Sequence, residues 1–230
     1  MGSEETKNLS NKQEYTLTIL NENTKFQQFV IFQKVPSASS YDPFSLAWMV
    51  GGASVGAPGN PSQPQFNLTV DYSAPVGSIQ EIGTTTPPRS FETISQMGVR
   101  INSANTVGAN YQGQFSDGVT GLPNEPVDDT QAVTDINADD ALPTVAVRHS
   151  ENVSLNVGLA MAGKSAIAVQ LEPNLTYQFK PNPTYYIIAG SFVQGQVIDT
   201  AISSAAYDTE FLDDGVQPAA GKPFSLDVDG

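Results

Sequence analysis

The sequence has no cysteine and few basic residues. Because 230 residues contain no cysteine, the chain cannot form a disulfide framework, a thiolate nucleophile or a thiolate-ligated iron–sulfur cluster. Ten Lys and Arg stand against 24 Asp and Glu, which gives a formal net charge of −14. Nucleic-acid binding requires clustered basic side chains, and no basic run occurs here. The same negative field repels anionic lipid, so we expect neither nucleic acid nor membrane as a partner.

Long apolar runs are also missing. No stretch of 18 apolar residues is present that could span a membrane. Residues 1–14 are polar and lack the apolar stretch of a signal peptide, which predicts a cytoplasmic protein, or one exported without a recognisable signal peptide. Charged residues make up only 15% of the chain, against about 25% in an average domain, which disfavours long exposed helices.

Histidine occurs once, at position 149. Zinc and iron sites draw on several His or Cys residues, and a Ser–His–Asp triad lacks its G-x-S-x-G elbow here. Two carboxylates could hydrolyse glycosides, but 24 acidic residues single out no pair. We therefore predict a protein that is not an enzyme, with no catalytic and no cofactor-binding residue.

What the sequence does contain is β-strand patterning in nearly every segment. Apolar and polar residues alternate in three segments, as in strands with one buried face, and three denser apolar runs predict strands buried on both faces. The alternating segments are 66–72, 153–159 and 175–179, and the denser ones are 26–32, 44–50 and 184–192. About ten short strands separated by turn signals predict an all-β fold, a single antiparallel β-sandwich or jelly roll. This domain would span residues 15–230, after a polar N-terminal arm of residues 1–14.

Two stretches depart from this pattern. Residues 51–64 are rich in Gly and Pro and predict a loop, and residues 117–143 predict a long acidic loop insertion. A connection of that length inside a compact domain is typical of a functional or a disordered segment. Only residues 92–97 and 128–133 could form short helical turns.

Residues 158–165 match the phosphate-binding pattern G-x-x-x-x-G-K-[ST]. That site requires a helix that begins at Lys164 with its N-terminus facing the phosphates. Ile167, Val169 and Leu171 instead alternate as in a strand, and Pro173 leaves too little room for a helix. We therefore expect a hairpin turn with Gly163 at a positive φ.

Residues 135–140 contain four oxygen-bearing side chains that open like a calcium loop: Asp135, Asn137, Asp139 and Asp140. An EF-hand needs Gly at its sixth position and Glu at its twelfth, and Asp140 and Ala146 stand there, which excludes that motif. Calcium held by a loop of a β-sandwich stays open as a hypothesis for these four residues. The alternative is a solvated acidic surface that contributes only to solubility.

Two blocks of the sequence resemble a known family. YTLTILNENTKFQQFVIFQKVP (15–36) with FSLAWMV (44–50), and PNLTYQFKPNPTYYIIAGSFVQGQVID (173–199), are similar to segments of the rhizosphere-induced protein RhiA family. Residues 51–150 carry no such resemblance. The resemblance implies a single domain of β-sandwich type without an assigned enzymatic activity, and it brings no catalytic residues.

Two classes of function follow. The first is a structural, non-enzymatic protein that acts by self-association or by interaction with another protein, because unguarded strand edges recruit further strands. In that case the N-terminal arm would add to the sheet of a neighbour in a homo-oligomer. The alternative is a carbohydrate-type ligand-binding module, assisted by calcium in the acidic segment. Trp48 and the tyrosines could line a sugar platform, but the spacing around Trp48 favours a place in the core.

Overall fold

All regular elements of the described structure are β-strands. The computed structural model describes residues 14–34, 43–53, 55–69, 71–81, 89–100, 104–111, 117–120, 133–144, 154–180, 184–198, 207–210 and 224–226. These residues form seventeen strands and no helix, which confirms the all-β prediction. Accordingly, none of them forms a helix that is long and apolar enough to cross a membrane.

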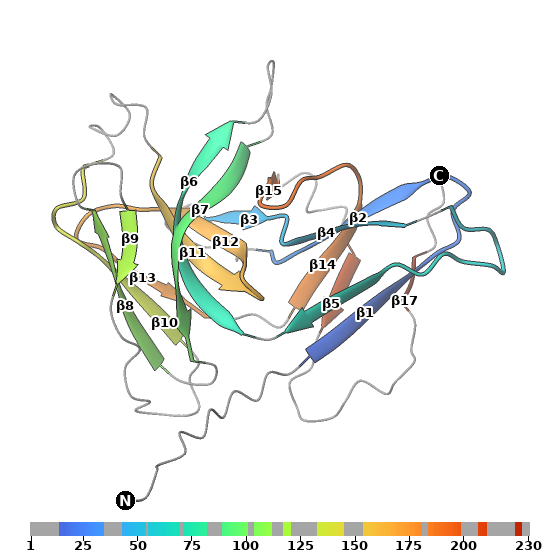
Figure 1. Ribbon diagram of the computed structural model, residues 1–230, viewed down its shortest axis with the longest axis horizontal. Helices are drawn as coiled ribbons and strands as arrows, with labels where there is room; N and C mark the ends of the chain where they lie inside the picture. The colour runs from blue at the N-terminus through green and yellow to red at the C-terminus, as the bar shows by residue number, and fades with distance from the viewer. Residues whose placement is uncertain are drawn as a thin grey trace, which may run out of the picture.

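One half of the molecule is a six-stranded sheet that packs against a four-stranded sheet (Figure 1). The larger sheet has the order β15 (Val197–Ile198), β3 (Phe44–Leu46), β12 (Lys164–Gln170), β11 (Asn156–Met161), β6 (Tyr72–Glu81), β7 (Arg89–Val99). The smaller sheet has the order β13 (Thr176–Phe179), β10 (Val133–Ala138), β8 (Ala104–Tyr111), β9 (Asp117–Thr120). The first core fills the space between them, with Val76, Ile136 and Leu159 among its buried residues.

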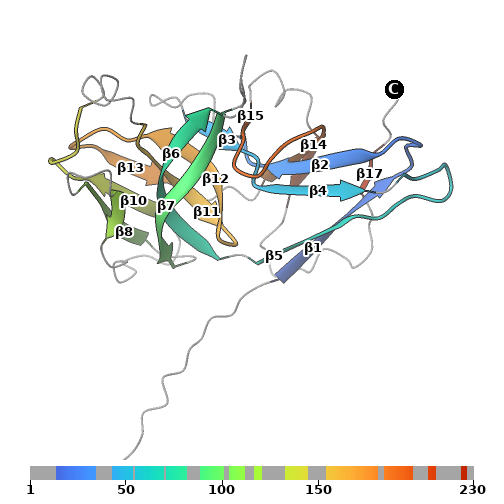
Figure 2. The same ribbon diagram turned by 45° about the horizontal axis from the view of Figure 1, so that its top comes forward.

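The other half is a second pair of sheets, which Figures 1 and 2 show beside the first pair. The three-stranded sheet has the order β17 (Phe224–Leu226), β1 (Glu14–Asn21), β5 (Gln65–Thr69). The four-stranded sheet has the order β16 (Tyr207–Glu210), β14 (Thr184–Ala189), β2 (Gln27–Phe32), β4 (Met49–Ala53). A second core joins these sheets through Ile19, Phe29, Phe66 and Ile187. The alternation of apolar and polar residues in β5 gives this strand one face toward the core. Phe66 and Leu68 are buried on that face, while Gln65 and Asn67 are exposed on the other.

Two strand pairs are parallel, β8 with β10 and β1 with β17, and the other pairs of the described residues are antiparallel. The structure thus has the packed sheets of a β-sandwich type, but its apolar residues gather in two main cores rather than one. Residues far apart in the sequence supply each core, so the chain passes between the two halves several times.

Several local predictions were wrong. Residues 92–97 form no helical turn but lie in β7, where Ile94 is the extra residue of a β-bulge opposite Val76 and Gly77. Residues 51–53 continue β4 instead of starting a loop, because glycine can pair through its backbone with β2. Glu14 belongs to β1 rather than to the arm, and residues 1–13 lie outside the described residues.

The acidic segment 117–143 is not one uninterrupted loop, since it contains β9 and β10. Both strands are held by backbone pairing with β8, which does not depend on side-chain polarity. Residues 121–132 lie outside the described part of the chain, so most of the second expected helical turn does too.

Candidate functional site

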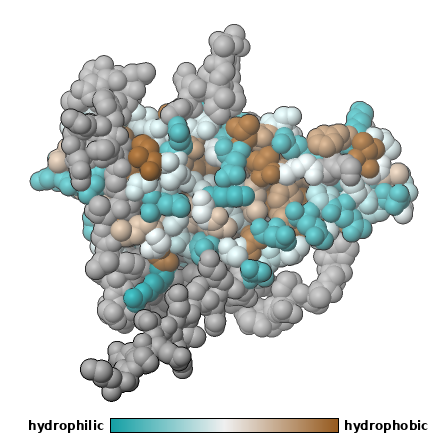
Figure 3. All heavy atoms as spheres, viewed as in Figure 1, coloured by the Kyte–Doolittle hydropathy of each residue, from teal (hydrophilic) through white to brown (hydrophobic). Residues whose placement is uncertain are grey.

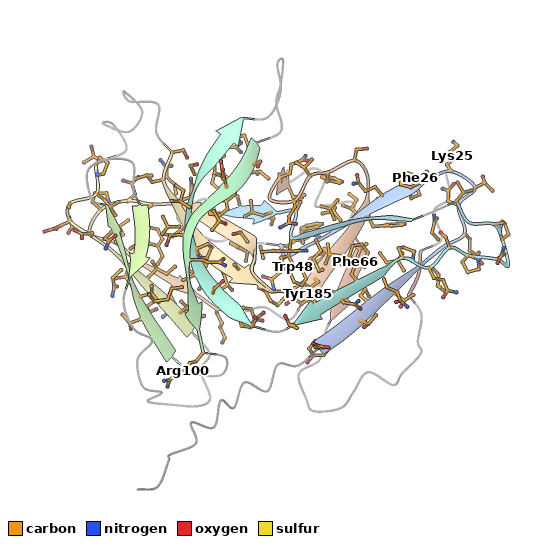
Figure 4. The ribbon with its side chains drawn as sticks, viewed as in Figure 1. Lys25, Phe26, Trp48, Phe66, Arg100 and Tyr185 are labelled. Atoms are coloured by element: carbon orange, nitrogen blue, oxygen red, sulfur yellow. The ribbon has the colours of Figure 1, made fainter. Side chains whose placement is uncertain are left out.

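Two of the most exposed large apolar side chains lie at one end of the second pair of sheets. Phe26 is 64% exposed and Val55 is 55% exposed. Phe26 directly precedes β2 and Val55 follows β4, and these strands pair at Gln27 and Ala53, which places both side chains at the same end. Figure 4 labels Lys25 and Phe26 there, and Figure 3 shows hydrophobic and hydrophilic groups side by side at this end of the surface. Burying either side chain against another surface would be favourable, because removing apolar area of this size from water lowers the free energy.

The edge strand β4 adjoins these two residues. Within the described residues β4 pairs with β2 alone, so its other side is an edge of the sheet. A Cβ atom at Gly51 would lie 2.7 Å from the buried Phe66 ring, and one at Gly52 would lie 3.0 Å from the exposed Phe26 ring. The two aromatic rings thus cover the two faces of a strand that has no side chain at these positions. We call Phe26, Val55 and β4 together the tip patch.

The connection from β4 to β5 keeps the tip patch in place. Gly56 donates a backbone hydrogen bond to the carbonyl of Asn23 (2.9 Å), and Asn21 and Ser62 exchange backbone hydrogen bonds (2.9 Å each). The Asn21 side chain also accepts a hydrogen bond from the backbone N–H of Asn23 (3.0 Å). The sheet end beneath Phe26 and Val55 is therefore well bonded, although the two apolar side chains face solvent.

A buried aromatic cluster joins the two halves of the molecule. The Trp48 indole Nε1 donates a hydrogen bond to the Met161 carbonyl (2.8 Å), and the Tyr185 hydroxyl donates one to the Met161 sulfur (3.0 Å). The Trp48 and Tyr185 rings lie 5.3 Å apart between centroids (Figure 4). Trp48 is fully buried, which confirms its predicted place in the core. We call Trp48, Met161 and Tyr185 the seam.

Burial raises the pKa of Tyr185 well above its ordinary value, and the nearby Tyr72 raises it further. The hydroxyl therefore stays protonated at physiological pH and acts as a donor to Met161. Met161 ends β11, a strand of the first core, while its own side chain lies in the second core. The polar groups of the seam are thus hydrogen-bonded within a packed core, an arrangement that stabilises the structure.

The segment that matches the phosphate-binding pattern is a hairpin turn, as expected. β11 ends at Met161 and β12 begins at Lys164, and the two turn residues have positive φ values of 51° for Ala162 and 70° for Gly163. Two central residues with positive φ are typical of the turn that joins antiparallel strands by two residues. Ser165 lies within β12, with its Oγ 3.1 Å from Oγ1 of Thr93. No helix follows, so this turn lacks the N-terminus that a phosphate site requires.

Two of the four residues of the calcium hypothesis lie in β10 and bind the neighbouring strand β13. Asp135 accepts a hydrogen bond from the Gln178 side chain (3.0 Å), and Asn137 accepts one from the Thr176 hydroxyl (2.7 Å). These are exposed cross-strand pairs, a form of side-chain contact that stabilises sheets.

The other two, Asp139 and Asp140, follow the end of β10. The backbone N–H of Ala141 donates to Asp139 (2.8 Å), and this bond, with a contribution from Asp140, lowers the pKa of Asp139. Among the described residues, no three His, Cys, Asp or Glu side chains gather into a group that could hold a metal ion. Calcium binding in this segment stays an open hypothesis, and His149 lies outside the described residues.

The tip patch was not predicted from the sequence. Phe26 opens the dense apolar run 26–32, which predicts a buried strand, yet the strand begins one residue later and leaves Phe26 exposed. The pairing of residues 51–53 with β2 was not predicted, because the Gly-rich composition of residues 51–64 is typical of a loop.

Comparison with known families identifies the family to which the chain belongs. The model of the RhiA family matches residues 12–214. The chain belongs to the RhiA family. No curated protein and no solved structure matches it. The part that matches the RhiA family includes the tip patch and the seam, whereas β17 lies beyond its end.

Proposed function

We propose that this RhiA family protein acts by associating with protein, in the first place with a second copy of itself, and that the tip patch is the contact surface. The observation that carries the proposal is an exposed phenylalanine beside a strand without charged residues that is a sheet edge among the described strands. The strand β4 reads MVGGA, and the Phe26 ring lies over Gly52 while 64% of Phe26 faces solvent.

The chemistry of the tip patch suits the addition of a strand. An edge strand offers unpaired backbone N–H and C=O groups to an incoming strand, and glycine lets another backbone approach closely. Phe26 and Val55 would serve as apolar anchors beside this edge. Burying one such side chain fully contributes about 1.5–3 kcal/mol.

The net charge opposes association of two copies at a distance. At physiological ionic strength charges more than about 8 Å apart are largely screened, so added salt reduces repulsion between two chains of net charge −14. An apolar contact at the tip patch should therefore strengthen with salt, whereas a contact between opposite charges would weaken.

Sedimentation velocity over a concentration series tests the proposal. We expect the wild-type mass to rise reversibly with concentration, and more so at higher salt. The variant with Phe26→Ser and Val55→Ser should stay monomeric. The matched control replaces two exposed apolar residues elsewhere, Ile94→Ser and Val193→Ser, and should associate as the wild type does.

A wild-type chain that is monomeric at every concentration would refute self-association. Equal loss of association in the tip variant and in the control would refute the tip patch as the contact surface. Circular dichroism of both variants checks that they keep the strand content of the wild type.

A further inference from the structure

The strand β17 occupies the edge of β1. It pairs with β1 in parallel, with Phe224 beside Ile19, Ser225 beside Leu20 and Leu226 beside Asn21. Ile19 and Asn21 are the buried positions of this part of β1. The register thus places an apolar residue beside each of them. Three register pairs hold β17, and among the described strands it pairs with β1 alone.

The family match makes this pairing informative. It ends at residue 214, and β17 begins at residue 224. Within the matched part that the structure describes, β1 pairs with β5 and has its other edge open. The chain therefore closes this edge with residues from outside the part that matches the family.

We infer that the outer edge of β1 is an acceptor site for a parallel extended strand, and that β17 of a second copy exchanges into it. The exchange extends the proposed self-association to another surface, because the edge of β1 and the tip patch are different sites. In the exchanged state, β17 of one copy makes the same backbone pairs with β1 of the other copy as it makes within its own chain in the closed state. The exchange therefore needs no new type of contact.

The number of residues between β16 and β17 limits how far β17 can reach. Residues 211–223 separate β16 from β17, and thirteen residues span at most about 45 Å when extended. A strand held by three register pairs also opens at little cost compared with a central strand. At high protein concentration the β17 of a neighbour then competes with the chain's own β17 for the same edge.

Engineered cysteines test the exchange in the full chain, because the natural sequence has none. Leu20 and Ser225 are register partners, and Leu20 is only partly buried. The double variant Leu20→Cys with Ser225→Cys should form a disulfide within one chain at low concentration. A mixture of the two single variants should form a disulfide-linked pair of twice the monomer mass, which reduction removes.

The matched control mixes Ser225→Cys with Thr16→Cys, a β1 position four residues out of register. If the mixture of Leu20→Cys and Ser225→Cys forms no more linked pairs than this control, the exchange is refuted. If the double variant still forms its internal disulfide in that case, β17 pairs only with its own chain. No disulfide in the double variant would overturn the acceptor site as well. The mixture is repeated with Phe26→Ser and Val55→Ser present, where linkage should persist, so that failure of the tip patch and failure of the exchange are told apart.

Discussion

Replacing Trp48 by phenylalanine should weaken the whole molecule, because Trp48 joins its two cores. The substitution removes the hydrogen bond from Nε1 to the Met161 carbonyl (2.8 Å) in a fully buried place. Removing the donor of a buried hydrogen bond costs about 1–3 kcal/mol. The smaller ring leaves a void, and a void of methyl size adds about 1 kcal/mol. We expect a loss of about 2–4 kcal/mol, which corresponds to a fall in Tm of roughly 5–15 °C for a chain of this size.

Urea and thermal unfolding followed by circular dichroism measure this loss, since the substitution removes the only tryptophan. The control is Tyr177→Phe, which removes a buried hydroxyl that accepts a hydrogen bond from the Glu172 N–H (2.6 Å) within the first core alone. We expect one transition for both variants, with the larger shift for Trp48→Phe. A shift within about 0.5 kcal/mol of wild type, the range of ordinary surface substitutions, would refute the role of the seam. A transition that splits in two in the wild type would show that the cores unfold independently.

Three further predictions concern other parts of the structure. Gly51→Ala should lower the free energy of unfolding in urea by about 1–3 kcal/mol, because its Cβ would lie 2.7 Å from the Phe66 ring. The control is Gly52→Ala, whose Cβ would meet only the end of an exposed ring, and its free energy of unfolding should stay close to that of the wild type. The lowered pKa of Asp139, caused first by the backbone N–H two residues along the chain and then by its neighbour, contributes stability above the unfolded pKa. The wild type should therefore be more stable than Asp139→Ala at neutral pH, the difference should vanish in acid below the lowered pKa, and a difference independent of pH would contradict this origin. Millimolar calcium should leave the Tm unchanged; a rise that Asp135→Ala with Asp139→Ala abolishes would establish calcium binding instead.

The sequence predicts the strands of this fold better than it predicts their neighbours. The alternation around Phe66 and the burial of Trp48 were predicted correctly, because each depends on which face of a strand meets the core. Alternation carries no information about which strand lies alongside, so the parallel pairs and the division into two cores could not be predicted. The bulge at Ile94 breaks the alternation of β7, and this is why residues 92–97 resembled a helical turn.

The candidate site was harder to predict than the fold, for a physical reason. Phe26 is exposed because β2 starts after it, and one residue of difference in a strand boundary separates a buried ring from an exposed one. The hairpin at Ala162 and Gly163 was predictable, because the residues after it alternate as a strand does and therefore exclude the helix of a phosphate site.

The contrast between two edge strands supports the tip patch as the contact surface. Proteins guard edges against unwanted pairing with charged side chains, bulges and covering segments. The edge strand β7 has all three: Arg89 and Glu92, the bulge at Ile94, and the backbone hydrogen bond from Phe91 to Gly195 (2.8 Å) that covers its start. The edge strand β4 has no charged residue, and no bulge interrupts its pairing with β2. Among the described residues, one edge is thus fully protected, whereas the edge of β4 beside the exposed Phe26 has no such protection and is suited to pairing. Charged substitutions at Gly52 should then block association without unfolding the sheet.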